Sequence, residues 1–493
     1  MIPETADSQG KHAMAADSYE AVIGLEVHTH LLTRAKLFCG CAAGFGAGPN
    51  ENVCPVCMGM PGVLPVLNRR AVELAIRMGL AAHCEISLYS IFDRKSYFYP
   101  DLPKGYQISQ YETPLCKGGY IEIDPAGNGE PRRIRLVRIH MEEDAGKNIH
   151  EADASLVDFN RSGVPLVEIV SEPDIRSVEE AGAYLRELRA ILRYIGASEG
   201  RMEEGNFRCD VNISVRRAGT SEYGTKTEIK NLNSFRFVEK AIEHEVKRQI
   251  EVLESGGRVT QETHLWDPLR QETRPMRSKE FANDYRYFPE PDLPPLRVSQ
   301  ELIDQIRAAM PELPADRRAR FVHDVGLTPY EARVLSEERE VADYFEKAIA
   351  VGLKNHKGAA NFVMTEVLRA VNESGKSLEQ AAPSADETGA LLKMVEAGTI
   401  SLNAAKTAFA AMCKSGLGAA ATVDELELVQ VSDASAIGAA CDSLIAAEPA
   451  KVAQYRAGRD KLFGFFVGMV MKAMAGKANP KMVNEILRKK LSG

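Results

Sequence analysis

The hydrophobic pattern of this sequence changes at a proline-rich segment, Asp284–Leu296. Before it, apolar residues recur at every second position in several runs, which is the pattern of half-buried β-strands, and helical runs separate them. After it, nearly every run follows the 3.6-residue period of a helix. The segment contains four prolines, which exclude a long helix and favour an extended connector. The sequence therefore predicts an α+β region followed by an all-α region.

Individual elements can be placed from the same patterns. Ser177–Tyr194 is a predicted helix with a capping box between Ser177 and Glu180, and a second helix covers 234–254. Asn128-Gly129 indicates a hairpin turn, and Ala381–Glu387 resembles a linker. The predicted strands are Ala21–Leu32, Tyr120–Asp124, Arg132–Met141, Leu166–Ser171, Asn206–Val215 and Lys226–Lys230. The predicted later helices are Ala315–Asp324, Pro329–Leu335, Ser336–Ala350, Gly358–Asn372, Gly458–Ala475 and one that starts at Pro480.

Length and composition exclude some classes of protein. The 493 residues are enough for two to four domains. No apolar run is long enough for a membrane span, so we expect no membrane contact. Residues 1–18 contain Glu4, Asp7 and Asp17 and lack the apolar stretch of a signal peptide. We therefore expect a mobile extension on a cytoplasmic protein, with Met14 as an alternative start.

Charge is distributed unevenly along the chain. The net charge is −8, yet Lys451–Gly493 holds ten Lys and Arg against Asp460 and Glu485, a net +8 that leaves −16 elsewhere. A basic tail on an acidic body is a candidate nucleic-acid contact. A solvated helical face is an equally good interpretation of the charge alone.

The first predicted strand carries polar residues on one face. Because alternate residues point to opposite faces of a strand, Glu26, His28 and His30 share a face, and Ile23 and Leu25 lie on the other. An acid and two imidazoles are an unusual surface set and indicate a metal or catalytic site. A solvated strand face is the alternative.

Other segments supply more charge. Asp210 and Arg208 share a strand face, as do Lys226, Glu228 and Lys230. The run Glu142-Glu143-Asp144 places three carboxylates together, which repel unless a cation or hydrogen bonds hold them, although a solvated loop is the alternative. Such oxygen ligands suit Mg²⁺, and neighbouring Lys and Arg suit the phosphates that Mg²⁺ bridges.

Four of the nine cysteines cluster in the sequence. Cys39, Cys41, Cys54 and Cys57 have the spacing C-x-C-x12-C-x2-C, with the second pair on a knuckle around Pro55. This spacing predicts a closed, structural Zn²⁺ site, and a redox pair is the alternative. The scattered cysteines are expected to be packing residues. They are Cys84, Cys116, Cys209, Cys413 and Cys441.

Several catalytic motifs are missing. The sequence contains neither a strict phosphate-binding G-x-x-x-x-G-K-[ST] loop nor a G-x-S-x-G elbow. It also has no Gly/Ser-rich tract of the kind that houses an amidase serine. A reaction that needed ammonia would have to receive it from another protein.

From about Tyr19 to the C-terminus, the sequence closely resembles the B subunits of bacterial-type GatCAB aminoacyl-tRNA amidotransferases. The matching stretches are Val22–His28, Cys54–Cys57, Pro61–Pro65, Phe92–Asp101, Lys104–Gln110, His140–Gly146, Val170–Ile175, Arg208–Asn212, Glu228–Phe235 and Asp284–Pro291.

The resemblance implies a fold and a reaction. It implies a cradle domain around an antiparallel sheet (19–297) with an ATP/Mg²⁺ site and a zinc knuckle, a helical domain (298–412) and a YqeY-like tRNA-binding tail (413–493). The implied reaction is ATP-dependent phosphorylation of the side-chain carboxylate of Glu-tRNA(Gln) or Asp-tRNA(Asn). Ammonia from the glutaminase, which is the A subunit, then displaces the phosphate within a heterotrimer that also holds the C subunit.

The resemblance also implies site residues, and it leaves His30 out of the metal site. The implied catalytic and Mg²⁺ residues are Glu26, His28, Glu142, Glu143, Asp210 and Glu228. Candidates for ATP phosphate contacts, chosen by charge and motif position, are Lys95, Lys104, Arg161, Arg208, Lys226 and Lys230. The implied Zn²⁺ ligands are the four clustered cysteines. Two other classes stay open on the residues alone: a zinc-containing RNA adaptor, and a metal-dependent nuclease or phosphatase.

Overall fold

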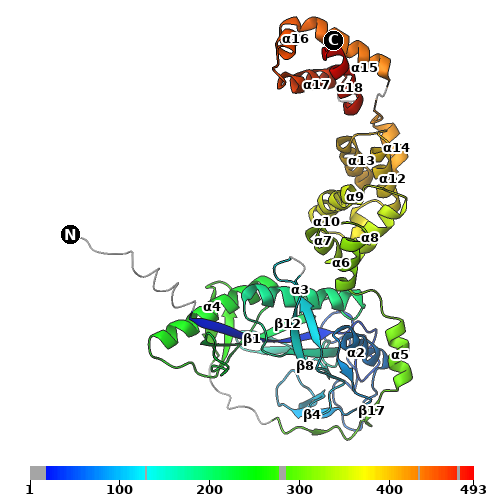
Figure 1. The fold of residues 1–493 in the computed structure, drawn as a ribbon. Coiled ribbons are helices and arrows are strands. Elements are labelled where there is room, and N and C mark those ends of the chain that lie inside the picture. Colours follow the sequence, from blue (N-terminus) through cyan, green and yellow to red (C-terminus); the bar gives the residue numbers. More distant parts are fainter. Residues whose placement is uncertain (1–17, 128–129, 277–284, 431–432, 475–477, 493) are drawn as a thin grey trace, which may run out of the picture. The chain divides into compact units, whose positions relative to one another are not determined.

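A computed structural model describes residues 18–127, 130–276, 285–430, 433–474 and 478–492 (Figure 1). The chain divides into two compact units, Met1–Arg317 and Arg318–Gly493. The predicted extension 1–18 lies outside the described residues except for Ser18, and so does the predicted turn Asn128-Gly129. Among the described helices, none is both long enough and apolar enough to cross a membrane.

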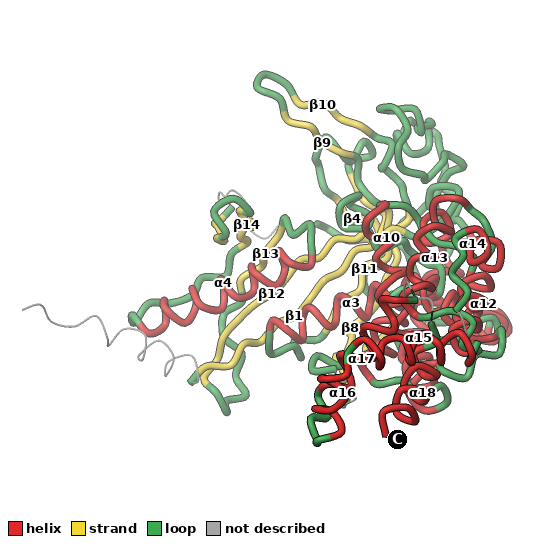
Figure 2. The backbone as a smooth tube through the Cα atoms, turned by 90° about the horizontal axis from the view of Figure 1, so that it is seen from above, coloured by secondary structure: helices red, strands yellow, loops and turns green. Residues whose placement is uncertain are grey.

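A ten-stranded sheet forms the centre of the first unit (Figure 2). Its strands in spatial order are β15 (Glu272–Pro275), β14 (Thr263–Asp267), β13 (Thr227–Lys230), β12 (Phe207–Arg217), β1 (Tyr19–His30), β11 (Pro165–Ser171), β8 (Arg132–Glu143), β6 (Cys116–Lys117) and β2 (Glu85–Ile86), and β7 (Tyr120–Ile123) pairs with β8 beside this path. All neighbours are antiparallel except β13 and β14. The expected antiparallel sheet is therefore mixed, because helix α4 (Phe235–Glu254) carries the chain back to the starting end of β13 before β14 begins.

One face of this sheet is covered by helices. The odd-numbered residues of β1, Ile23, Leu25 and Val27, are fully buried in one core with Tyr184 and Leu188 of helix α3 (Val178–Tyr194). Helix α4 packs on β12, and α2 (Arg69–Ala81) and α5 (Gln300–Ala308) join the same core. The polar residues of β1 and β12 therefore lie on the other face, where they are only partly buried.

Shorter strands lie outside the main sheet. β4 (Asp93–Ser96) pairs with β5 (Tyr106–Ser109) and with β16 (Phe288–Pro289), and β9 (Lys147–His150) pairs with β10 (Ser155–Asp158). β3 (Tyr89–Ser90) pairs with β17 (Leu296–Arg297). The six strands predicted from alternation are confirmed within a few residues. The short strands outside the main sheet are absent from that prediction.

The second unit is helical, as predicted, and α6 (Pro314–His323) leads into it. Its further helices are α7 (Pro329–Ser336), α8 (Arg339–Ala350), α9 (His356–Phe362), the π-helical turn η1 (Val363–Val367), α10 (Leu368–Ser374), α11 (Leu378–Ala381), α12 (Ala385–Glu396), α13 (Leu402–Ser415), α14 (Ala419–Glu425), α15 (Ala434–Ala447), α16 (Pro449–Arg456), α17 (Leu462–Ala473) and α18 (Pro480–Ser492). One core runs from Phe321 to Val423 and another from Ile437 to Leu491.

Two sequence interpretations change here. The prediction of a linker at Ala381–Glu387 is wrong. Helix α11 ends at Ala381 and α12 begins at Ala385 with Ser384 as its cap, so only a short connection separates the two helices. The domain boundaries at 297/298 and 412/413 stay predictions. Helix α5 contributes Ile303 and Ile306 to the first core, and α13 runs through residue 413.

Candidate active site

Strand register brings polar residues from several strands onto the face that the helices leave open. Glu26 of β1 lies opposite Asp210 of β12, and His28 lies opposite Glu168 of β11. Glu168 is in turn opposite His140 of β8. Because these partners share a face of the sheet, segments more than 100 residues apart in sequence form one polar surface.

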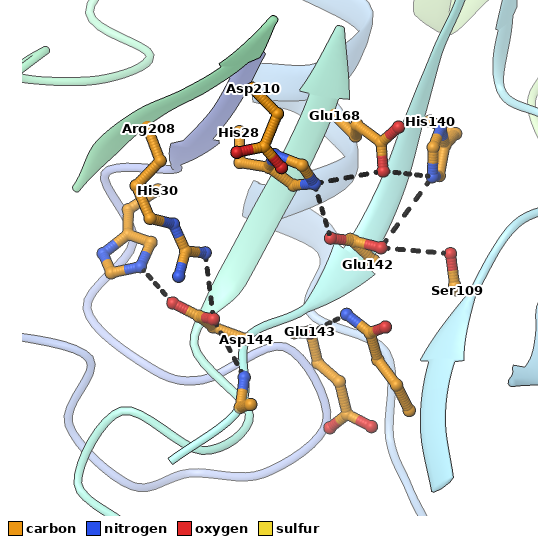
Figure 3. A network of polar contacts seen from close by, with 12 residues as sticks. His28, His30, Ser109, His140, Glu142, Glu143, Asp144, Glu168, Arg208 and Asp210 are labelled. Carbon is orange, nitrogen blue, oxygen red and sulfur yellow. Dashed lines mark hydrogen bonds and ion pairs between the residues drawn. The ribbon is translucent and has the colours of Figure 1, made fainter. Parts of the chain in front are cut away.

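His28, Glu142 and Glu168 form the centre of this surface. Three ligand atoms, one from each residue, lie within 4.8 Å of one another. The His28 Nε2 atom is 3.1 Å from a Glu168 oxygen and 3.7 Å from a Glu142 oxygen, and Figure 3 shows the three side chains pointing toward one another. His140 Nε2 lies 3.4 Å from Glu168, and the Ser109 hydroxyl donates to Glu142 at 3.3 Å. One imidazole and two carboxylates therefore converge on a single point.

Electrostatics show that this point attracts positive charge. Burial opposes protonation of His28, but the hydrogen bond and charge of Glu168 and the charge of Glu142 raise its pKa to about 9. Burial and the charge of Glu168 raise the pKa of Glu142. Burial lowers the pKa of His140 to about 4. Without a metal ion, His28 is therefore protonated, and its positive charge offsets the negative charge of the two carboxylates.

A second cluster surrounds Asp144, just beyond the end of β8. The carboxylate of Asp144 is almost completely buried and lies 2.7 Å from His30 Nε2 and 3.0 Å from Arg208 (Figure 3). Arg161 Nε lies 3.3 Å from the same carboxylate. Burial opposes its ionisation, but the charges of Arg208 and Arg161 and the His30 hydrogen bond hold the pKa of Asp144 well below its usual range. Asp144 therefore fixes two guanidinium groups beside the central cluster. It also explains why His30 shares the face without joining the metal cluster.

The remaining acids of the face lie toward β13. Asn212 donates to Glu26 at 2.8 Å, and burial followed by the charges of other carboxylates, Glu168 first, raises the pKa of Glu26. Lys230 lies 3.0 Å from Asp210 and 3.1 Å from Glu228. These three carboxylates extend the acidic surface along the sheet, but Asp210 and Glu228 are already paired with a cation.

Glu143 is not brought together with the other predicted metal ligands. It follows Glu142 in β8, so it points to the opposite face of the strand, and Figure 3 shows it directed away from the His28 cluster. Its carboxylate forms an ion pair with Lys104 and accepts the Ile108 backbone N–H at 2.9 Å. Glu143 and Lys104 instead line a small cavity that also contains Cys57.

The remaining predicted basic residues lie at different places. The charge of Lys95 acts on Glu142 and on Glu168, so Lys95 lies next to the central cluster. Lys226 is exposed and lines a separate cavity with Glu26. Of the six phosphate candidates, Arg161 and Arg208 therefore pair with Asp144, Lys104 pairs with Glu143, and Lys230 pairs with Asp210 and Glu228.

The clustered cysteines come together as predicted from their spacing. The sulfurs of Cys39, Cys41, Cys54 and Cys57 all lie within 4.8 Å of one another. The Cys54 and Cys57 sulfurs are 4.0 Å apart, near the ~3.8 Å expected for sulfurs around tetrahedral Zn²⁺. The fully buried ammonium of Lys36 lies 3.6 Å from Cys57 Sγ and donates to the carbonyls of Asn52 and Phe159. All nine cysteines are free thiols, so the donor set fits a zinc ion.

Sequence reasoning missed two members of the central surface. Glu168 is the single charged residue of the strand Pro165–Ser171, in which every other residue except Ser171 is apolar, and a lone acid in such a run was an available signal. His140 was visible as the residue two positions before Glu142 on the same strand face.

Comparisons with known proteins agree with this architecture. The model of the GatB/GatE catalytic domain matches residues 21–304, and the model of the GatB domain matches residues 343–491. The B subunit of the aspartyl/glutamyl-tRNA(Asn/Gln) amidotransferase of Thermodesulfovibrio yellowstonii is 55% identical over 96% of this chain and 99% of its own length. The proteins of the same name from Geobacter sulfurreducens and Chlorobium phaeobacteroides are 55% and 56% identical over 97% of this chain and their entire length. The resemblance drawn from the sequence motifs is thus confirmed, and the chain belongs to the family of aspartyl/glutamyl-tRNA(Asn/Gln) amidotransferase B subunits.

Proposed function

We propose that this chain carries the kinase and amide-transfer site of a tRNA-dependent amidotransferase. Its substrate is Glu-tRNA(Gln), Asp-tRNA(Asn) or both, and ATP activates the side-chain carboxylate by phosphorylation. Ammonia comes from the glutaminase (A) member of a heterotrimer that also holds the C subunit, because the chain has no amidase motif of its own. The convergence of His28, Glu142 and Glu168, in a chain whose relatives are named as amidotransferase subunits, is the observation that carries the proposal.

The central cluster fits a magnesium ion held by His28, Glu142 and Glu168. Two carboxylates supply hard oxygen ligands and leave positions for water or phosphate oxygens. Bound there, Mg²⁺ would offset the negative charge between ATP and the substrate carboxylate. Ser109 and His140 hold the two carboxylates in place through their polar contacts. Glu26, Asp210 and Glu228 lie on the same face of the sheet and are retained as members of the proposed site. Glu143, which pairs with Lys104 on the other face of β8, is retained as a catalytic residue outside the metal coordination.

Basic residues beside the cluster orient the anionic substrates. Arg208 is about one-third exposed, and Asp144 holds one of its nitrogens, which leaves the rest of the guanidinium facing the sheet surface. Arg161 is held by Asp144 and by the carbonyls of Ala145 and Gly146. Lys95 adds positive charge that acts on Glu142 and Glu168, and we retain Lys104, Lys226 and Lys230 as further phosphate contacts.

Two further parts of the chain complete the proposal. The four-cysteine cluster binds a structural Zn²⁺ that closes the loop between Cys39 and Cys57. Residues 19–297 form the cradle domain, 298–412 a helical domain and 413–493 a tRNA-binding tail. The exposed lysines of α18, Lys481 and Lys489, are the basic groups that we assign to tRNA.

Reconstitution tests the function directly. The heterotrimer with the A and C subunits is given misacylated Glu-tRNA(Gln) or Asp-tRNA(Asn), glutamine and ATP, with and without Mg²⁺. We expect amide formation and ATP consumption that require both Mg²⁺ and the aminoacyl group. ATP consumption that does not depend on the aminoacyl group, or tRNA cleavage in place of amidation, would contradict the proposal.

A further inference from the structure

A cluster of tyrosines lies beside the acidic surface. Five of the fifteen tyrosines in the chain are joined by ring contacts, although they come from two segments far apart in sequence. Tyr111 stacks on Tyr287 with ring centres 4.2 Å apart, and Tyr287 contacts Tyr285 edge to face at 6.2 Å. Tyr285 in turn contacts Tyr97, which stacks on Tyr99. We call these five residues the tyrosine cluster.

The tyrosine cluster is close to the proposed metal ligands. Tyr111 follows Ser109 by two residues, and the Ser109 hydroxyl donates to Glu142 at 3.3 Å. Burial and then the charges of Glu142 and Glu168 raise the pKa of Tyr287, which stacks on Tyr111. The Lys95 ammonium lies 4.8 Å from the centre of the Tyr285 ring, and its charge also acts on Glu142 and Glu168. Lys95 therefore stands between an aromatic surface and an acidic one.

Exposure argues against a purely structural role for Tyr99 and Tyr111, whereas Tyr97, Tyr285 and Tyr287 are half-buried. Tyr111 is 46% exposed, Tyr99 is 43% exposed, and the neighbouring Phe98 is 89% exposed. Aromatic side chains that serve only to pack a fold bury most of their surface, as Tyr184 and Tyr194 do in the sheet core. Exposed rings beside a lysine are the usual means by which proteins hold unpaired nucleobases.

We propose that the tyrosine cluster is a stacking site for an adenosine. This inference rests on the proposed function, which brings two adenosines to the site: the nucleoside of ATP and the 3′-terminal residue of tRNA. A base stacked on these rings would direct its phosphate or aminoacyl group past Lys95 toward His28, Glu142 and Glu168. The aromatic surface thus sets the distance between base and reacting group, which the charged residues alone cannot do.

Binding measurements on the assembled heterotrimer test this site. Tyr111→Ala and Tyr287→Ala are compared with Tyr111→Phe, which keeps the ring, and with Tyr330→Ala, a 57% exposed tyrosine on α7 in the other unit. The ligands are ATP, inorganic tripolyphosphate, tRNA, and tRNA lacking its 3′-terminal adenosine. Loss of one stacking ring is expected to raise the Kd of an adenosine-bearing ligand by about 5- to 150-fold.

The ligand set separates the two sources of adenosine. Weaker ATP binding with unchanged tripolyphosphate binding identifies the base of ATP. Weaker binding of intact tRNA, with unchanged binding of tRNA that lacks its 3′-terminal adenosine, identifies the tRNA terminus. Both the Tyr111→Phe and Tyr330→Ala variants should bind as the unmodified chain does.

Other outcomes would overturn the inference. Unchanged Kd values for ATP and tRNA in both alanine variants would do so, as would an equal loss for ATP and tripolyphosphate. Failure of the alanine variants to assemble with the A and C subunits would make the surface a protein interface and also overturn it. If the unmodified heterotrimer binds neither ATP nor tRNA, the proposed function itself fails.

Discussion

Glu142 and Glu143 offer a matched pair for testing which side of β8 holds the metal. They are adjacent, and each is 3% exposed, so the two substitutions are made at equally buried positions. Glu142 faces His28 and Glu168, and Glu143 faces Lys104 on the other side of the strand. We expect Glu142→Gln to raise the Mg²⁺ concentration needed for amidation and Glu143→Gln to leave that concentration unchanged, whatever its effect on the maximal rate.

The size of the effect follows from the contacts. Glutamine keeps the oxygen that accepts from Ser109 at 3.3 Å, so the fold is retained, but it removes one of the two negative charges of the cluster. Loss of an outer partner of a metal ligand costs about 10- to 100-fold in affinity, so loss of a charged ligand is expected to cost at least about 100-fold. A factor of 100 corresponds to about 2.8 kcal/mol.

The assay is a Mg²⁺ titration of tRNA-dependent amidation by the reconstituted heterotrimer. It is run at pH 7 and at pH 9.5, because removing Glu142 also lowers the pKa of His28 and so relieves competition by its proton at the lower pH. The half-maximal Mg²⁺ concentration should rise for Glu142→Gln at both pH values, and more at pH 9.5. The reasoning is refuted if Glu142→Gln has the half-maximal Mg²⁺ concentration of the unmodified chain, or if Glu143→Gln shifts it further.

Three further predictions concern other parts of the molecule. The raised pKa of His28 keeps a proton on the ring below about pH 9, and this proton competes with a metal ion. The affinity of the metal-free heterotrimer for Mn²⁺, measured by equilibrium titration, should therefore rise roughly tenfold per pH unit from about pH 7 to 9 and then level off. An affinity that does not change with pH contradicts this. Lys36→Met removes the buried cation beside Cys57, so the purified variant should contain less zinc by atomic absorption. Lys226→Met, at an exposed lysine, is the control. Full zinc content in the Lys36→Met variant would show that Lys36 does not support the site. Lys481→Glu with Lys489→Glu should weaken tRNA binding and lower the salt slope by about 0.7–0.9 for each phosphate that the tail no longer neutralises, whereas unchanged affinity would leave the tail charge as a solvated face.

Much of the candidate site followed from residue alternation alone. The face of β1 that carries Glu26 and His28 was visible because Ile23, Leu25 and Val27 occupy the other face, and the structure buries all three completely. The four-cysteine cluster was visible because its members are close in sequence. Both predictions depend only on local geometry, which a sequence records directly.

The prediction of Glu143 as a metal ligand disagrees with the alternation of side chains along β8. The predicted metal site includes both Glu142 and Glu143, although the strand Arg132–Glu143 requires neighbouring side chains to point in opposite directions. Applied to this strand, alternation pairs Glu142 with His140 and separates both from Glu143. The structure follows that separation, with Glu143 held by Lys104 and Ile108.

The pairing register between strands, which decides which side chains meet in the site, cannot be predicted from any single strand. Glu168 meets His28 because β11 pairs with β1, and it meets His140 because β8 pairs with β11, although these three strands are separated by long connections. A slip of one residue in either pairing would turn Glu168 toward the core and replace it on the polar face with Val167 or Ile169. The apolar residues of β11 forbid such a slip, because Val167 and Ile169 are fully buried and would lose that burial. The position of the metal ligands is therefore determined by the hydrophobic residues between them, and substitutions such as Ile169→Ser should disturb the site without touching a charged group.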